Sequence, residues 1–219
     1  MALKIQIIIA FLVTLFSTSA FAADPAPALI RTLQEGGNVL LFRVPESIMG
    51  SDRVVFSSRN FEYCEEQRTL SPRGMEDART IGEAIRHQGI HISEVVSSAY
   101  CRTLQSSSIA FPEQSIQINR QLNSICREST KNMAGFSEEL LRRIQAPVDQ
   151  GNRIIMGHQC NIQYLLKRDI TAFESDRLRL SAGEALVIRP GDDSFQIIGI
   201  ITLKTWYQWA EKPFNKRPE

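Results

Sequence analysis

Two arginines and one histidine follow predicted strands of this chain, namely Arg43, Arg102 and His158. The predicted strands before them cover residues 38–42, 94–98 and 153–156, and the first of these is a continuous apolar run. Such short apolar runs are typical of parallel strands that are covered on both faces. The carboxyl ends of parallel strands meet at one edge of a sheet, where open α/β sheets bind their ligands. We therefore expect the three side chains to line one crevice.

These three side chains suit a dianionic phosphoryl group. An arginine presents a planar fork of donors that matches phosphate oxygens. Helices predicted to begin near Tyr100 and Asn161 would add amino-terminal N–H groups and the positive ends of their dipoles. A strand-end arginine is more often a salt-bridge partner, however, and a lone histidine is more often structural. The spacing alone is therefore compatible with an anion site and also with these structural roles.

Strands alternate with helices along the chain, which favours an α/β fold. The best-marked helix covers residues 72–88, because Ser71 supplies the N-cap, Pro72 suits the first helical position and Gly89 ends it. Further helices are predicted at 28–34, 100–110, 137–145 and 161–167, and further strands at 115–119, 184–189 and 195–203. We predict a three-layer sandwich with a mostly parallel central sheet flanked by helices and an antiparallel edge hairpin.

Some features outside this framework have two interpretations each. Residues 45–63 show no regular period and are predicted to form a long binding loop over the strand ends. Arg68 either reaches the crevice or pairs with Glu65 or Glu66. Three aromatic residues near the carboxyl end either cap the edge of the core or form a ligand or partner face: Trp206, Tyr207 and Trp209.

Residues 1–22 have the order of a secretory signal peptide: a charge at Lys4, an apolar run from Ile5 to Phe16, and small residues up to Ala22. A membrane anchor is the alternative, although the apolar run is short for one. We expect export, to a bacterial periplasm, and one mature domain of residues 23–219. Lys4 is one of 25 Lys and Arg, so the mature chain has 24 against 24 Asp and Glu. This balance predicts no nucleic-acid partner and, after cleavage, no membrane span.

All four cysteines, Cys64, Cys101, Cys126 and Cys160, lie in the part predicted to be exported. An even number in an oxidising compartment indicates two disulfides, for which three pairings exist. Metal binding is a weaker alternative, because the spacings are long and no C-x-x-C cluster occurs. Reduced, buried cysteines are the third possibility. We expect neither a metal nor a cofactor.

Four short motifs occur in an order that resembles the histidine phosphatase (phosphoglycerate mutase-like) superfamily. They are Leu41-Phe42-Arg43-x-Pro45-Glu46, Gln67-Arg68-x-Leu70-Ser71-x-x-Gly74, Ser97-Ser98-x-Tyr100-Cys101-Arg102-Thr103 and Gly157-His158-Gln159-x-Asn161-Ile162. The resemblance covers about residues 38–188. It is most similar to small exported members that resemble the lipopolysaccharide core heptose-phosphate phosphatases, because one cysteine precedes an acidic segment and another lies beside the second histidine, as Cys126 and Cys160 do here.

The resemblance implies a covalent mechanism. A histidine directly after the first strand-end arginine attacks phosphorus, two arginines and a second histidine hold the phosphoryl oxygens, and a carboxylic acid protonates the leaving oxygen. Carried over, Arg43 and Arg102 are the phosphate-binding arginines and His158 is the second histidine. Glu128 is the candidate acid, and Glu46 is the fallback.

The chain departs from this pattern at Val44, which occupies the position of the nucleophile. His87 and His91 are predicted at the opposite edge of the sheet, and disulfide pairing would remove the thiolates of Cys64 and Cys101. We therefore expect phosphohistidine turnover to be lost, either in a natural pseudoenzyme or in an inactive variant of a working enzyme.

Three functions remain open at this point. The first is a protein that binds a small phosphorylated ligand or phosphate but is catalytically impaired. The second is an active phosphomonoesterase on a sugar phosphate of the cell envelope, and the third is a partner-binding module with a vestigial site. The disulfides are expected as Cys64–Cys101 and Cys126–Cys160, since each pair joins segments predicted to meet at the rim of the crevice.

Overall fold

The computed structural model describes residues 25–50, 52, 64–126, 130–169, 179–192 and 194–214. The predicted signal peptide at 1–22 lies outside the described residues, as does the candidate acid Glu128. Among the described helices, none combines the length and the apolar character that crossing a membrane requires.

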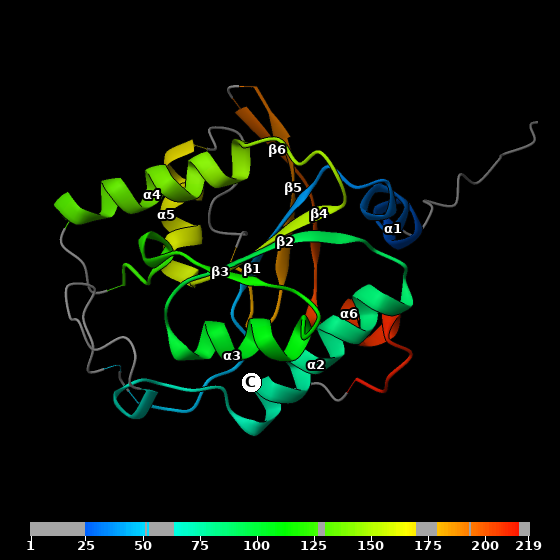
Figure 1. Ribbon diagram of the computed structural model, residues 1–219, viewed down its shortest axis with the longest axis horizontal. Coiled ribbons are helices and arrows are strands. Elements are labelled where there is room, and N and C mark those ends of the chain that lie inside the picture. The colour runs from blue at the N-terminus through cyan, green and yellow to red at the C-terminus, as the bar shows by residue number, and fades with distance from the viewer. Residues whose placement is uncertain are drawn as a thin grey trace, which may run out of the picture.

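A six-stranded mixed sheet in the order β3-β2-β4-β1-β5-β6 forms the centre of the protein (Figure 1). Its strands are β1 (Val39–Arg43), β2 (Ile92–Ser97), β3 (Ile116–Ile118), β4 (Asn152–Gly157), β5 (Ala185–Gly191) and β6 (Ser194–Ile201). The first four run parallel, whereas β5 is antiparallel to both β1 and β6. The predicted α/β class, mostly parallel sheet and antiparallel edge hairpin are therefore confirmed.

Six helices flank this sheet: α1 (Pro25–Glu35), α2 (Pro72–His87), α3 (Cys101–Ala110), α4 (Thr130–Gln145), α5 (Gln159–Asp169) and α6 (Leu203–Trp209). Two short 3-10 turns, η1 (Cys64–Glu66) and η2 (Arg120–Leu122), complete the elements. The N-cap hydroxyl of Ser71 accepts from the N–H of Gly74 at 3.0 Å, which confirms the predicted start of α2. Gly89 follows that helix with a φ of 63°, the left-handed conformation expected of it.

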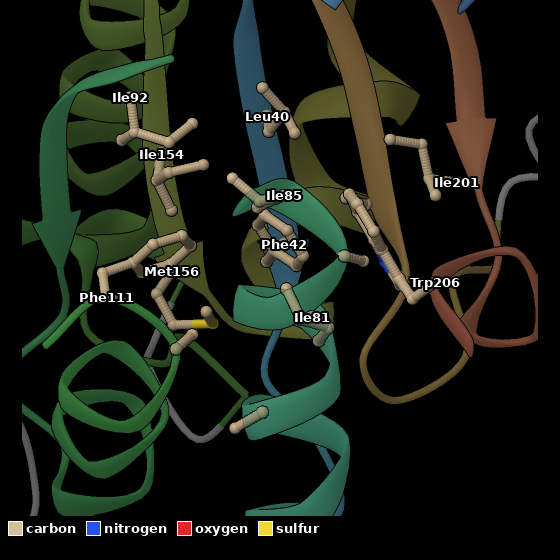
Figure 2. Packing of buried hydrophobic residues seen from close by; sticks show 14 of the residues in the cluster. Leu40, Phe42, Ile81, Ile85, Ile92, Phe111, Ile154, Met156, Ile201 and Trp206 are labelled. Atoms are coloured by element: carbon tan, nitrogen blue, oxygen red, sulfur yellow. The ribbon is translucent and has the colours of Figure 1, made fainter. Parts of the chain in front are cut away.

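Alternation along β1 divides the core into two clusters, one on each face of the sheet. Leu40 and Phe42 point to the face covered by α1, α2, α3 and α6, where Figure 2 shows them packed with residues such as Ile81 and Trp206. Val39 and Leu41 point to the opposite face, against α4 and α5. Both faces of β1 are thus buried, which is why its sequence is apolar without a break.

The aromatic residues at the carboxyl end belong to the core. Trp206 is fully buried and stacks on Phe42 with ring centroids 5.6 Å apart. Trp209 is buried beside it, and Tyr207 donates a hydrogen bond to Asp77. The short helix α6 that carries them was not predicted. Their role in the core was predicted, and it is confirmed for both tryptophans.

The amino-terminal edge of the parallel strands is tied by buried amides. The side chain of Asn38 donates to that of Asn152 at 3.1 Å, and Asn152 donates to the backbone carbonyls of Leu33 and His91. His91 therefore lies at the edge opposite to the carboxyl ends, as predicted. The candidate site residues Arg43 and His158 lie at the opposite edge of the sheet, at the carboxyl ends of β1 and β4.

Candidate anion-binding site

A cavity of about 520 Å³ opens at the carboxyl ends of β1 and β4. Its lining combines strand ends, the segment after β1 and the segment before β5: Arg43, Val44, Pro45, Glu46, Ser47, Met49, Arg68, Arg102, Ser124, Cys126, His158, Gln159, Ser181 and Ala182. The structure thus brings Arg43, Arg102 and His158 to one cavity, although they are far apart in the sequence.

Arg43 is the last residue of β1 and is held from the side of β5. Its backbone N–H donates to Glu184 at 3.0 Å, and its carbonyl accepts from Gly183 at 3.0 Å. The guanidinium donates from Nη1 to the carbonyl of Leu180 at 2.5 Å. The segment that directly precedes β5 therefore orients this arginine.

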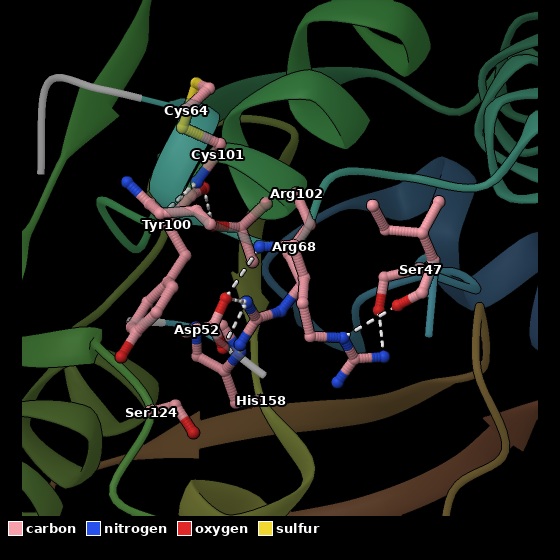
Figure 3. A network of polar contacts seen from close by, with 12 residues as sticks. Ser47, Asp52, Cys64, Arg68, Tyr100, Cys101, Arg102, Ser124 and His158 are labelled. Carbon is pink, nitrogen blue, oxygen red and sulfur yellow. Dashed lines mark hydrogen bonds and ion pairs between the residues drawn. A yellow bond between two sulfur atoms is a disulfide. The ribbon is translucent and has the colours of Figure 1, made fainter. Parts of the chain in front are cut away.

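Arg102 lies in the first turn of α3 and is buried. Its guanidinium carbon lies 4.4 Å from the centre of the Tyr100 ring, and Nη1 donates to both oxygens of Asp52 at 2.8 and 3.0 Å. Burial lowers the pKa of Arg102 from its ordinary value, and the Asp52 carboxylate opposes that shift. Figure 3 shows the two groups facing each other above His158.

His158 is buried and both of its ring nitrogens have protein partners. Nδ1 lies 3.3 Å from Nη2 of Arg102, and Nε2 lies 2.7 Å from the hydroxyl of Ser98. A guanidinium can only donate, so Nδ1 accepts and the ring proton lies on Nε2. Burial, followed by the charge of Arg102, holds the pKa of His158 well below its ordinary value. The imidazole is therefore neutral, with Ser98 supported in turn by Thr103 at 2.7 Å.

Val44 is the residue for which the sequence resemblance predicts the position of a nucleophile. Its backbone N–H donates to Gly157 at 3.0 Å, so it continues the β1–β4 ladder by one residue. Its side chain is buried, belongs to the same core cluster as Phe42, and lines the cavity. An aliphatic group with no lone pair to offer a phosphorus atom therefore lines the same cavity as Arg43 and Arg102.

The carboxylate of Glu46, the fallback acid, also lines the cavity. It accepts a hydrogen bond from the Ser71 hydroxyl at 2.8 Å, which links it to the N-cap of α2. Gly74 permits this link, because a Cβ at that position would lie 1.9 Å from the carbonyl oxygen of Glu46. The start of α2 and the segment after β1 are thus in direct contact.

Arg68 lies at the cavity and not against its acidic neighbours in the sequence. Its side chain donates to the carbonyl of Ile48 at 2.9 Å and to the hydroxyl of Ser47 at 2.6 Å. Within the described ranges it forms no ion pair with Glu65 or Glu66. Of the two interpretations offered by the sequence, the structure supports the first.

Two of the N–H groups at the amino end of α3 are used inside the protein. The amino end of α3 was predicted to offer its first N–H groups to a ligand. The N–H of Cys101 instead donates to the side chain of Gln67 at 3.0 Å, and that of Tyr100 lies 3.4 Å from the Ser98 hydroxyl. These two donors are therefore not available to a ligand, whereas the side chain of Arg102 lines the cavity.

Two disulfides flank the cavity in the expected pairing, Cys64–Cys101 and Cys126–Cys160. The first ties η1 to the residue before Arg102, and the second ties a wall of the cavity to the first turn of α5. In the part of the chain that the structure describes, no group of three or more His, Cys, Asp or Glu side chains could hold a metal ion.

Sequence reasoning gave Asp52 no role and named Ser98 only within a motif. Ser98 could have been identified, because it directly follows β2 and the carboxyl ends of parallel strands share one edge of the sheet. Asp52 carried no such signal, since the loop that contains it has no period from which its path could be predicted.

Comparison with known proteins shows the fold. A scan against protein-family models finds no match, and neither does a search of curated proteins. Solved structures do match. A candidate alpha-ribazole-5′-P phosphatase from Escherichia coli has a TM-score of 0.59 at 14% identity over 77% of this chain and 98% of its own. The protein histidine phosphatase SixA complexed with tungstate has a TM-score of 0.51 at 12% identity over 76% and 97%.

A third match is a histidine-to-alanine mutant of phosphoserine phosphatase from Entamoeba histolytica in complex with phosphoserine. Its TM-score is 0.55 at 9% identity over 77% of this chain and 98% of its own. Identities this low identify a shared fold and leave the activity open. The strand order, the cavity at the carboxyl ends and these matches together show that the chain has the histidine phosphatase (phosphoglycerate mutase-like) fold.

Proposed function

We propose that this protein binds a phosphomonoester, or inorganic phosphate, and does not turn it over through a phosphohistidine. The observation that carries the proposal is that Arg43 and Arg102 line one cavity, which is also lined by Val44. Guanidinium groups supply charge-assisted donors for phosphoryl oxygens, whereas the aliphatic side chain of Val44 supplies no nucleophile.

The two arginines make the direct contacts with the phosphoryl group in this proposal. His158 has a different first task, because its Nδ1 accepts from Arg102 and its Nε2–H donates to Ser98. A neutral imidazole held in this way orients the guanidinium, and it contacts a phosphoryl oxygen only by releasing one of these partners. Glu128 stays the proposed acid of any hydrolysis, with Glu46 as the fallback.

The mutant phosphoserine phosphatase supports the separation of binding from turnover. That protein was crystallised with phosphoserine although a histidine had been replaced by alanine. A histidine phosphatase fold that lacks one histidine can therefore still hold a phosphomonoester. The two disulfides of the present chain also support the proposed export to an oxidising compartment.

Binding is tested by calorimetric titration with inorganic phosphate and by thermal melting at millimolar phosphate. We expect a stabilising shift that is lost in Arg43→Ala and retained in Arg189→Ala, which removes an exposed arginine from the edge hairpin. Equal behaviour of the wild type and Arg43→Ala would contradict the proposal.

The missing nucleophile is tested by Val44→His, with Val44→Asn as the matched control. We expect Val44→His to hydrolyse p-nitrophenyl phosphate and to trap a phosphohistidine, detectable by its acid-labile phosphorus signal, while Val44→Asn and the wild type do neither. Comparable hydrolysis by the wild type would show that turnover does not need a histidine at this position.

A further inference from the structure

The carboxylate of Asp52 pairs with Arg102, the arginine that the proposed function assigns to phosphate. Both of its oxygens accept from Nη1 of Arg102, at 2.8 and 3.0 Å, and Oδ1 also accepts from the backbone N–H of Arg68 at 2.9 Å (Figure 3). This arrangement of a guanidinium and a backbone N–H around one anionic group is the donor set that a phosphoryl group uses.

The contact is largely removed from solvent. The side chain of Arg102 is 7% exposed and that of Asp52 is 16% exposed. A pair this buried is screened little by salt, so the carboxylate compensates most of the charge that Arg102 would offer to a ligand. An incoming dianion would therefore meet an arginine that is already paired with an anion.

The position of the carboxylate is fixed from the other side as well. The N–H that holds it belongs to Arg68, whose side chain is anchored on Ser47 and Ile48. The neighbouring turn η1 is joined to α3 by the Cys64–Cys101 disulfide, one residue before Arg102. Both donors to Asp52 are thus held in place, and little ordering is needed to keep the carboxylate on the guanidinium.

We propose that Asp52 is an internal anion that competes with the phosphorylated ligand for Arg102. The inference rests on the proposed function, since it presumes that Arg102 binds phosphate. For a ligand to take the full charge of Arg102, the Asp52 carboxylate must leave it. The apparent affinity is then the affinity of the vacated site multiplied by the fraction of molecules in which Arg102 is vacant.

This scheme has a quantitative signature. The fraction of vacant sites is a property of the protein alone, so the competition weakens every anion by the same factor. A purely positioning role for Asp52 would have the opposite consequence, because its removal would release Arg102 and weaken binding. Repulsion by a carboxylate that stays in place would penalise dianions more than monoanions.

The test is a calorimetric titration of the wild type, Asp52→Asn and Asp52→Ala with inorganic phosphate and with dimethyl phosphate, a monoanion. We expect both variants to bind each anion at least about tenfold more tightly, with equal factors for the two. Where wild-type binding of the monoanion is too weak to measure, methyl phosphate at two pH values, one on each side of its second ionisation, provides the comparison. Glu83→Gln is the control. It removes from α2 a carboxylate that pairs with Lys212, and its affinities should equal those of the wild type.

Unchanged or weaker binding in both Asp52 variants would overturn the competition, and so would a gain restricted to the dianion. Failure of the proposed function looks different, because Arg43→Ala would then bind phosphate as well as the wild type does. Phosphate binding that depends on Arg43 but is not improved by either Asp52 variant would leave the function standing and remove the inference.

Discussion

Nη2 of Arg102 lies 3.3 Å from Nδ1 of His158, and this contact determines which nitrogen of the neutral imidazole carries the proton. Because the guanidinium cannot accept, the histidine must. The neutral imidazole of His158 therefore orients the guanidinium of Arg102, and the two residues do not act as two cations that face one anion. This distinction leads to the first of four predictions.

We predict that His158 makes the protein less stable in weak acid. Burial and the charge of Arg102 hold its pKa well below the ordinary value of about 6.5, so the folded protein stays neutral at this ring while the unfolded chain takes up a proton. The stabilisation is complete above about pH 6.5 and declines as the pH falls towards the lowered folded pKa. Relative to His158→Gln, the wild type should lose stability in urea unfolding as the pH falls from 7.5 to 5.5, by at most about 1.4 kcal/mol per pH unit.

Glutamine is the matched replacement in that experiment, because its carbonyl can accept from Arg102 while its amide donates to Ser98. Parallel pH dependences of the two unfolding free energies would show that His158 is not the group responsible.

The second prediction concerns the buried pair of Asp52 and Arg102. Arg102→Met leaves a carboxylate without its cation and should cost about 3–5 kcal/mol of unfolding free energy. Adding Asp52→Asn to Arg102→Met should restore part of that loss, since the amide is uncharged. Chemical denaturation of the four proteins in a double-mutant cycle measures the coupling. A cycle whose losses simply add would mean that the two groups do not interact.

The third prediction compares alanine substitutions at two helical glycines, Gly74 in α2 and Gly135 in α4. Gly74→Ala should destabilise by at least about 3 kcal/mol, because the new Cβ would lie 1.9 Å from the carbonyl oxygen of Glu46 and would push α2 away from the segment after β1. Gly135→Ala in α4 meets no atom within 4 Å and should stabilise by about 0.5–1 kcal/mol. Thermal unfolding of both variants checks the contrast, which equal effects would contradict.

The fourth prediction addresses the disulfides. Cys126→Ser with Cys160→Ser opens a link between residues 34 apart in sequence and should cost about 3–4 kcal/mol by the loop-closure argument. Phosphate affinity should fall as well, since the bond braces the wall next to His158. Unfolding and titration of the double variant test both statements. An oxidised wild type no more stable than this variant would refute the first.

The sequence predicted the parts of the site that lie on regular elements. Arg43 and His158 follow uninterrupted apolar strands, and strand direction alone places their side chains at one edge. Neither the order of the strands nor the pairing of β5 with β1 could be read from the sequence, because such pairings depend on contacts between distant segments. For the same reason, the contact between the Leu180 carbonyl and the Arg43 guanidinium could not be predicted from the sequence.

The polar network around Arg102 was the least predictable feature. Its partners come from a loop without period, from the end of β2 and from the start of α5. Each partner is an ordinary polar residue when viewed locally, and only the tertiary structure gives it a task. Helix α6 was missed for a related reason, since its aromatic residues are typical of strands as well as of helices.

The redox conditions under which the protein is prepared determine whether its two disulfides form. Cys101 directly precedes Arg102, and Cys160 is two residues beyond His158. A preparation from a reducing cytosol and one from an oxidising secretion pathway would thus share the same domain sequence but differ in the covalent links of α3 and α5. Titrations of the two should be compared only after their thiol content has been measured.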